Sequence, residues 1–186
     1  MLFFLIIIQI ILNKSYINVI PVKTITRTIG NDTYIIGTGK YNNDVLIKLI
    51  ELRKYMYSFC KKINNDIDKF SNIRPNILLL KKRIKGIILK ENVMNNSSTS
   101  YTYDKGKEMT ICLRKGKHFF DDNVLHYVIL HEISHIACDE YGHTKKFNYI
   151  FEEFVLYAIL IGYYNKVDYK NNPYNYCGLI INASIV

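Results

Sequence analysis

The spacing of apolar residues changes several times along this chain, and each spacing predicts a different element. Residues 2–12 are apolar except for Gln9. Residues 23–43 combine glycines with short β-branched runs, and they predict either a tether or a small hairpin. From Asp44 to Ile63, apolar residues recur every three or four positions, which predicts a long amphipathic helix. Lysines and arginines fill the other positions of this helix, so a solvated face is the leading interpretation of their charges.

The second half of the chain predicts a hairpin followed by two helices. A loop over 64–76 and a short basic helix over 77–85 come first. Residues 101–103 and 109–113 then alternate in polarity around a turn-forming sequence, which is typical of a β-hairpin. Helical spacing of apolar residues follows in two stretches, one beginning near residue 122 and one at Thr144. Together these elements predict an α+β fold.

The first of these two helices carries the motif H-E-x-x-H, at His131-Glu132-Ile133-Ser134-His135. Histidines four positions apart lie one above the other on one face of a helix, so both can reach a single metal ion. Zn²⁺ is the natural occupant, because imidazole suits it and hydrolysis needs no redox change. Glu132 lies one position further round the helix, where it can accept a proton from a metal-bound water without ligating the metal. A chance pentapeptide is the alternative, and the apolar helical context argues against it.

A third metal ligand is expected downstream, because a catalytic zinc usually has three protein ligands and one open position. Gly142 can end the helix and reverse the chain, which would bring His143 towards the first two histidines. Glu152 or Glu153, on the next helix, is the alternative third ligand. A solvated surface role remains open for each of these three residues.

Several segments resemble a known family. His131-Glu132-x-x-His135 followed by Gly142-His143-x-x-x-Phe147 resembles the WLM/SprT-like zinc metallopeptidases. A closer resemblance, covering most of the chain, is to the membrane-anchored metallopeptidases of large DNA viruses. Besides the zinc motif and the apolar start, it rests on Thr99-Ser100-Tyr101-Thr102, Lys105-Gly106, Cys112-Leu113-Arg114, Gly142-His143-Thr144 and Asn172-Pro173-Tyr174-x-Tyr176-Cys177-Gly178.

The resemblance implies a zincin-like minidomain over residues 44–165, in which a hairpin or small sheet lies beside the active-site helix. In zinc peptidases of this type, the strand before the active-site helix is often the sheet edge that aligns a peptide. Here that substrate-binding role is assigned to Ile111, Cys112, Leu113 and Arg114. The reaction also needs a donor for the developing oxyanion, and three residues remain candidates: Tyr141, Tyr149 and Arg114.

Residues 1–22 predict a single-pass transmembrane helix if the polar residues 13–15 are tolerated within it. An apolar strand or helix of the core is the alternative. Lysine and arginine follow the apolar run and none precedes it, so the positive-inside rule places the catalytic part on the cytoplasmic side. If the protein is viral, the membrane would be that of the host cell or of the virion.

Charge and cysteine content add two expectations. Residues 1–100 hold 16 basic and 6 acidic residues, whereas 101–186 hold 9 and 10. This asymmetry fits an anionic partner, either membrane headgroups or nucleic acid. The four cysteines have no paired spacing, so they predict neither a disulfide framework nor a second zinc site, and Cys112 and Cys138 are expected as buried thiols. Residues 166–186 are expected to form an irregular C-terminal tail with no assigned chemistry.

Three functions follow from these patterns. The first is a membrane-tethered zinc endopeptidase in which His131, His135 and His143 hold zinc and Glu132 is the general base. The second is a DNA-associated SprT/WLM-like protease that acts on DNA–protein crosslinks, although the sequence has no cysteine-rich zinc ribbon. The third is a non-catalytic, membrane-anchored interaction module with a structural zinc. Glu132 argues against the third, because a structural site has no use for a base.

Overall fold

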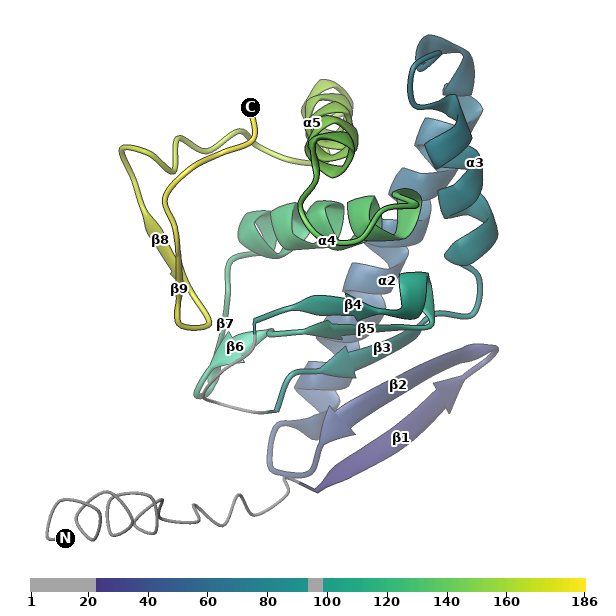
Figure 1. Cartoon of the computed structure of the whole chain (residues 1–186). Helices are drawn as coiled ribbons and strands as arrows, with labels where there is room; N and C mark the ends of the chain where they lie inside the picture. Colours follow the sequence, from purple (N-terminus) through teal and green to yellow (C-terminus); the bar gives the residue numbers. More distant parts are fainter. Residues whose placement is uncertain (1–22, 94–98) are drawn as a thin grey trace, which may run out of the picture.

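The computed structural model describes residues 23–93 and 99–186, which form an α+β fold (Figure 1). Four α-helices occur in the described residues: α2 (Asn42–Asn65), α3 (Arg74–Arg83), α4 (Asp122–Ala137) and α5 (Lys145–Leu160). The strands are β1 (Thr24–Ile29), β2 (Asp32–Gly37), β3 (Ile88–Glu91), β4 (Tyr101–Tyr103), β5 (Glu108–Ile111), β6 (Arg114–Lys115), β7 (His118–Phe119), β8 (Tyr174–Tyr176) and β9 (Leu179–Ile181). Short 3₁₀ turns lie at Ile67–Lys69 and Asp104–Gly106.

The main sheet has the strand order β1-β2-β3-β5-β4. Strands β2, β3 and β5 run parallel, while β1 and β4 are antiparallel to their neighbours. Pairing in register aligns Tyr34, Leu89 and Met109 in one row across the sheet, and all three are buried. Helix α2 packs against β2 and β3, and α4 lies between the edge strand β4 and α5 (Figure 1). The sheet therefore buries one row of side chains in the core, where α2 packs against β2 and β3, while α4, which carries the H-E-x-x-H motif, packs against β4.

Four predicted elements are confirmed, and two of them are the helices expected near residue 122 (α4) and at Thr144 (α5). The helix expected from Asp44 to Ile63 is α2, and its six periodic apolar residues are buried: Val45, Leu49, Leu52, Met56, Phe59 and Ile63. The expected hairpin is formed by β4 and β5. The solvated face of α2 is confirmed at Lys54, Lys61 and Lys62 but not at two other residues. The Lys48 side chain is only 18% exposed and pairs with Glu51 and Asp122. Arg53 is only 2% exposed and donates hydrogen bonds to Asp32 and to the main-chain carbonyls of Thr33 and Ile87.

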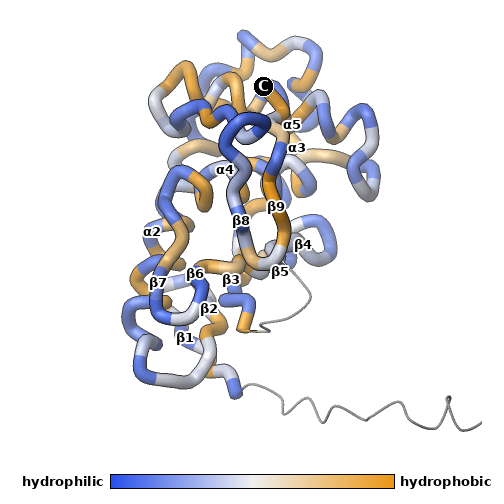
Figure 2. Tube along the Cα trace, turned by 90° about the vertical axis from the view of Figure 1, so that its left-hand side faces the viewer, coloured by the Kyte–Doolittle hydropathy of each residue, from blue (hydrophilic) through white to orange (hydrophobic). Residues whose placement is uncertain are grey.

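The predicted boundaries need three corrections. Residues 24–37 form the β1–β2 hairpin, which joins the main sheet through β2, so this segment belongs to the domain and is not a tether. Helix α3 begins at Arg74, three residues earlier than predicted, because Pro75 is tolerated in the first turn of a helix. The C-terminal tail is not irregular, because it contains the β8–β9 hairpin. Figure 2 shows that β9 is the more apolar of its two strands.

The cysteines also differ from expectation. Cys112, just after β5, forms a disulfide with Cys177 in the C-terminal hairpin, so it is not a buried thiol. Sequence spacing gave no sign of this bond, because the partners are 65 residues apart. Cys138 is a buried free cysteine as expected. The bond attaches the last segment of the chain to the end of a central strand.

The predicted anchor, residues 1–22, lies outside the described residues. Within the part of the chain that the structure does describe, no helix combines the length and apolar character needed to cross a bilayer.

Candidate metal centre

Helix α4 places the first two histidines on a rigid, buried element. The side chain of Asp121 caps its N-terminus by accepting a hydrogen bond from the main-chain NH of Asn123 at 2.9 Å. Leu125, Ile129 and Ile133 are fully buried along the helix. Because neighbouring elements pack on several sides of α4, the positions of His131 and His135 are determined by the core rather than by a mobile loop.

The third histidine comes from the loop that follows α4. Gly142 has a φ of +78°, a conformation that glycine adopts without strain, and the chain reverses there. Thr144 then caps α5 by accepting a hydrogen bond from the main-chain NH of Phe147 at 3.2 Å. These two residues hold His143 at the reversal, as the sequence predicted.

The three imidazoles converge on one point. The Nε2 atoms of His135 and His143 each lie 3.1 Å from Nε2 of His131. The ligand nitrogens of all three histidines lie within 4.8 Å of one another. A tetrahedral ion with bonds of about 2.0–2.1 Å requires nitrogens roughly 3.3 Å apart, so the cluster has the right size for a metal ion.

No carboxylate completes this cluster. Within residues 23–93 and 99–186, the three histidines are the one group that could hold a metal, and neither Glu152 nor Glu153 belongs to it. Phe147, on the same helix as the two glutamates, occupies the space beside the histidines instead. Its ring stacks on that of His135 with centroids 4.1 Å apart and meets the ring of His131 edge-on.

Burial lowers the pKa values of two of the three histidines. It lowers the pKa of His131 to about 3 and that of His135 to about 4, and the neighbouring histidines add to both effects. At neutral pH both rings are therefore uncharged, and the uncharged imidazole is the form that binds a metal. Two of the three ligands need lose no proton when an ion binds.

Glu132 lies beside the histidines but is held by a different partner. Its side chain is buried, with 3% exposure, and one carboxylate oxygen accepts a hydrogen bond from the Thr102 hydroxyl at 2.8 Å. Burial raises the pKa of Glu132 to about 7, and the hydrogen bond from Thr102 partly opposes this rise. A carboxylate with a pKa near neutrality can both accept and return a proton.

The metal cluster and Glu132 border one cleft of about 440 Å³. Its remaining lining comes from four other segments: Thr99–Thr102 on and before β4, Asp104 and Lys105 after it, Tyr141 and Gly142 before His143, and Leu179 of β9. The Lys105 ammonium donates hydrogen bonds to the main-chain carbonyls of Cys138 and Glu140 and lies 4.2 Å from the ring centre of Tyr141. A positive charge is thus fixed near His135, where it contributes to lowering the pKa of that histidine.

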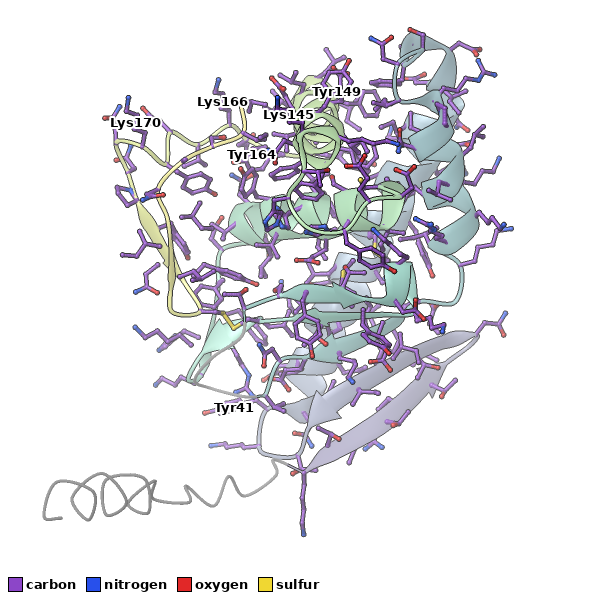
Figure 3. The ribbon with its side chains drawn as sticks, viewed as in Figure 1. Tyr41, Lys145, Tyr149, Tyr164, Lys166 and Lys170 are labelled. Atoms are coloured by element: carbon purple, nitrogen blue, oxygen red, sulfur yellow. A yellow bond between two sulfur atoms is a disulfide. The ribbon has the colours of Figure 1, made fainter. Side chains whose placement is uncertain are left out.

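Only one of the three candidate oxyanion donors borders this cleft. Tyr141 lines it and is 77% exposed. Tyr149 lies on α5, in the upper part of Figure 3, where its hydroxyl accepts a hydrogen bond from Asn72. Arg114 is paired with the carboxylate of Glu91 at 2.9 Å. The geometry therefore leaves Tyr141 as the candidate from this set.

The expected sheet edge is wrong. Ile111 ends β5, which lies between β3 and β4, and Ile111 and Leu113 are buried. Cys112 is in the disulfide, and none of the four residues Ile111–Arg114 lines the cleft. The reason is that β5 pairs with β3 after the turn, so the preceding strand β4 is left outermost. Among the strands that the structure describes, the outermost one beside the metal cluster is Tyr101–Tyr103.

Sequence reasoning missed the roles of Thr102, Lys105 and Leu179. The resemblance had singled out segments 99–102 and 105–106, yet no function followed from them. Their place on the cleft depends on β4 lying under α4, and sequence spacing does not encode that pairing. The polar alternation of residues 101–103 beside a more apolar partner strand was the available signal for an edge strand.

Comparison with known proteins finds viral relatives without an assigned activity. The chain is 39% identical over 126 residues to "Uncharacterized protein R325" of Acanthamoeba polyphaga mimivirus, covering 67% of this chain and 64% of that protein. It is 37% identical over 94 residues to "Uncharacterized protein 136R" of Invertebrate iridescent virus 6, covering 48% and 51%. A third match is "Uncharacterized protein 042R" of Invertebrate iridescent virus 3, 37% identical over 97 residues and covering 47% and 58%.

The matched segments thus span between about half and two thirds of these curated relatives. No family model matches the chain, and no solved structure matches it. The similarity to these viral proteins is a similarity of sequence, and their names state no activity.

Proposed function

We propose that this protein is a zinc-dependent endopeptidase with a zincin-like catalytic domain related to the WLM/SprT-like metallopeptidases. The observation that carries the proposal is the buried carboxylate of Glu132 beside three converging imidazoles, all bordering one open cleft. A purely structural metal site would gain nothing from burying an acid there, because a buried carboxyl without a cationic partner costs free energy. That cost is consistent with a catalytic use of the group.

The donor set supports zinc as the ion. Three imidazole ligands with no thiolate and an adjoining cleft match catalytic zinc sites, which keep one position open. When bound, zinc supplies Lewis acidity, which polarises a water molecule and the substrate carbonyl. His131, His135 and His143 would hold it.

The protein's own groups perform the remaining steps. Glu132 accepts a proton from the attacking water and returns it to the leaving amine, while the Thr102 hydroxyl keeps its carboxylate oriented. No strand of residues 23–93 and 99–186 pairs with the outer edge of β4, and an extended peptide can add there by main-chain hydrogen bonds. Tyr141 lines the cleft with the Lys105 ammonium over its ring, and we assign to its hydroxyl the hydrogen bond to the developing oxyanion.

Metal depletion and restoration test the proposal directly. The full chain is freed of metal with a chelator, reloaded with one equivalent of Zn²⁺, and incubated with a proteome-derived peptide library. Mass spectrometry of the products should show internal cleavages that require zinc and stop when chelator is added. A folded, zinc-loaded chain that cleaves no member of the library would refute endopeptidase activity.

We further propose that residues 1–22 anchor this catalytic domain in a membrane. The lysines and arginines that follow this segment favour the cytoplasmic side. The Cys112–Cys177 disulfide favours the opposite side, because disulfides persist mainly in oxidising compartments. Asn31 and Asn182 are exposed and stand in N-x-Ser/Thr sequons, which become glycosylated only in a lumenal domain.

Expression of the full chain in eukaryotic cells therefore decides the orientation. A glycosidase-sensitive shift in mobility, lost when the four sequon asparagines Asn31, Asn95, Asn96 and Asn182 are all replaced by Gln, places the domain in the lumen. No shift, together with resistance to carbonate extraction, supports the cytoplasmic orientation. Release of the protein from membranes by carbonate would contradict the proposed membrane anchor.

A further inference from the structure

The β8–β9 hairpin borders the cleft but takes no part in the chemistry described so far. Its two-residue turn is Cys177-Gly178, with φ values of +50° and +82°. Positive φ at both positions is characteristic of a type I′ turn, whose twist matches that of the two strands. The resulting register pairs Tyr176 with Leu179, so these two side chains share one face of the hairpin.

A disulfide, two hydrogen bonds of Tyr176 and the packing of its ring attach this hairpin to the neighbouring segments. The Cys112–Cys177 disulfide joins its tip to the end of β5 (Figure 3). The Tyr176 hydroxyl donates to the carbonyl of Cys112 at 2.7 Å and lies 2.6 Å from the Ser100 hydroxyl. The Ser100 hydroxyl accepts from the main-chain NH of Cys112 at 3.0 Å, and the ring of Phe120 packs 4.9 Å from that of Tyr176. The hairpin is therefore held as a fixed wall.

Leu179 is the exception to this close packing. It shares the face on which Tyr176 is buried against Ser100, and it lines the cleft together with Ser100, Tyr101 and Thr102. Its side chain nevertheless stays 58% exposed. An apolar side chain that lines the cleft beside residues of the edge strand and remains exposed can contact one more apolar group.

We propose that the β8–β9 hairpin is the specificity wall of the cleft, and that Leu179 binds an apolar side chain of the substrate peptide. This inference rests on the proposed endopeptidase function. A peptide added to β4 directs alternate side chains to opposite faces of the extended sheet, so only some of its positions can meet Leu179. The result is a preference for an apolar residue at one subsite, on one side of the scissile bond.

Cleavage profiling tests the inference with a charge-bearing variant. Wild-type protein and Leu179→Asp are compared on the same peptide library, and Leu160→Asp serves as the matched control. Leu160 is 77% exposed near the end of α5 and does not line the cleft. The apolar preference at one subsite should fall by about 10-fold or more in kcat/KM with Leu179→Asp, since pocket differences as small as a methylene are worth about 10–200-fold. The Leu160→Asp profile should match wild type.

A binding measurement separates this inference from the proposed chemistry. Anisotropy of labelled peptides bound to zinc-loaded Glu132→Gln protein reports the subsite without hydrolysis. If binding prefers apolar peptides and Leu179→Asp removes that preference, the assignment of Leu179 to an apolar subsite is supported even where no peptide is cleaved. If wild-type protein cleaves peptides and Leu179→Asp leaves both the profile and the binding unchanged, the inference is wrong and the endopeptidase stands.

The disulfide provides a second variant. Replacing Cys112 and Cys177 together by serine should weaken the apolar preference while cleavage continues, because the hairpin keeps Tyr176 but loses the covalent attachment of its tip. An unchanged preference in a variant shown to lack the bond would overturn the anchoring role of the disulfide.

Discussion

The two sides of the cleft are built in different ways. The metal side consists of His131, Glu132, His135 and His143, which span 13 consecutive residues on one helix and the loop after it. The substrate side consists of β4 with the nearby Lys105 and of the β8–β9 hairpin, two segments that are more than 60 residues apart in the sequence. The first is set by helix geometry and one chain reversal, and the second by strand pairing, a disulfide and a tyrosine. Local order therefore specifies the candidate metal cluster, and long-range order specifies the opposite side of the cleft.

The largest expected effect lies on the metal side. Glu132→Gln keeps the shape of the side chain and its hydrogen bond from Thr102 but removes the base. Activity on library peptides should fall by about 10²–10⁴-fold, the range typical of general acid–base catalysis. Zinc content should stay at one equivalent, because Glu132 is not among the three ligands. Turnover of Glu132→Gln near the wild-type rate would contradict the assignment of Glu132 as the general base.

The difference between the two sides also explains how much the sequence could predict. The spacing of His131 and His135 fixes their common face on a helix, and Gly142 marks the reversal that brings His143 back, so the metal cluster followed from local rules. The edge strand did not follow, because β4 becomes outermost only when β5 pairs with β3, a strand some 20 residues earlier in the chain. The hairpin was missed for the same reason, since Cys112 and Cys177 meet across 65 residues.

The second prediction tests whether the metal side is complete with three histidines. His143→Ala should weaken zinc binding by more than about 100-fold, since loss of even an outer-shell partner costs about 10–100-fold. Glu152→Ala and Glu153→Ala should retain zinc, because neither glutamate belongs to the cluster. Zinc content after dialysis against a graded chelator measures this. Loss of zinc from a glutamate variant, with retention by the histidine variant, would reverse the assignment.

The third prediction concerns the stability of the substrate side. Removing the Cys112–Cys177 disulfide by double serine replacement should lower the free energy of unfolding by about 2–4 kcal/mol, the usual range for a native disulfide. Cys60→Ala is the matched control, because Cys60 is a free cysteine and closes no loop. Denaturant titration of the metal-free proteins gives the comparison without the contribution of bound zinc. Equal midpoints and slopes for the double variant and wild type would show that the hairpin is held by its other contacts alone.

The smallest expected effect lies where the two sides meet. Thr102 belongs to the edge strand, yet its hydroxyl donates to the carboxylate of Glu132 on α4 at 2.8 Å. Thr102→Val preserves the size of the side chain and the main chain that would pair with a peptide. It removes only the hydrogen bond that orients the base, so kcat should fall by roughly 10-fold while KM changes little, because the lower end of the range for a hydrogen bond to a charged group, about 1.5 kcal/mol, corresponds to about that factor.

Thr102→Ser supplies the matched control, because serine keeps the hydroxyl and should retain most of the wild-type kcat. A general loss of structure would instead raise KM, lower the melting temperature and leave serine no better than valine. If Thr102→Val and wild type have the same kcat, the hydrogen bond from Thr102 to Glu132 has no catalytic role. Strand β4 would then position the peptide only. If only valine is slow, the edge strand positions the base as well as the substrate, because the residue that would pair with the peptide also fixes the group that takes the proton.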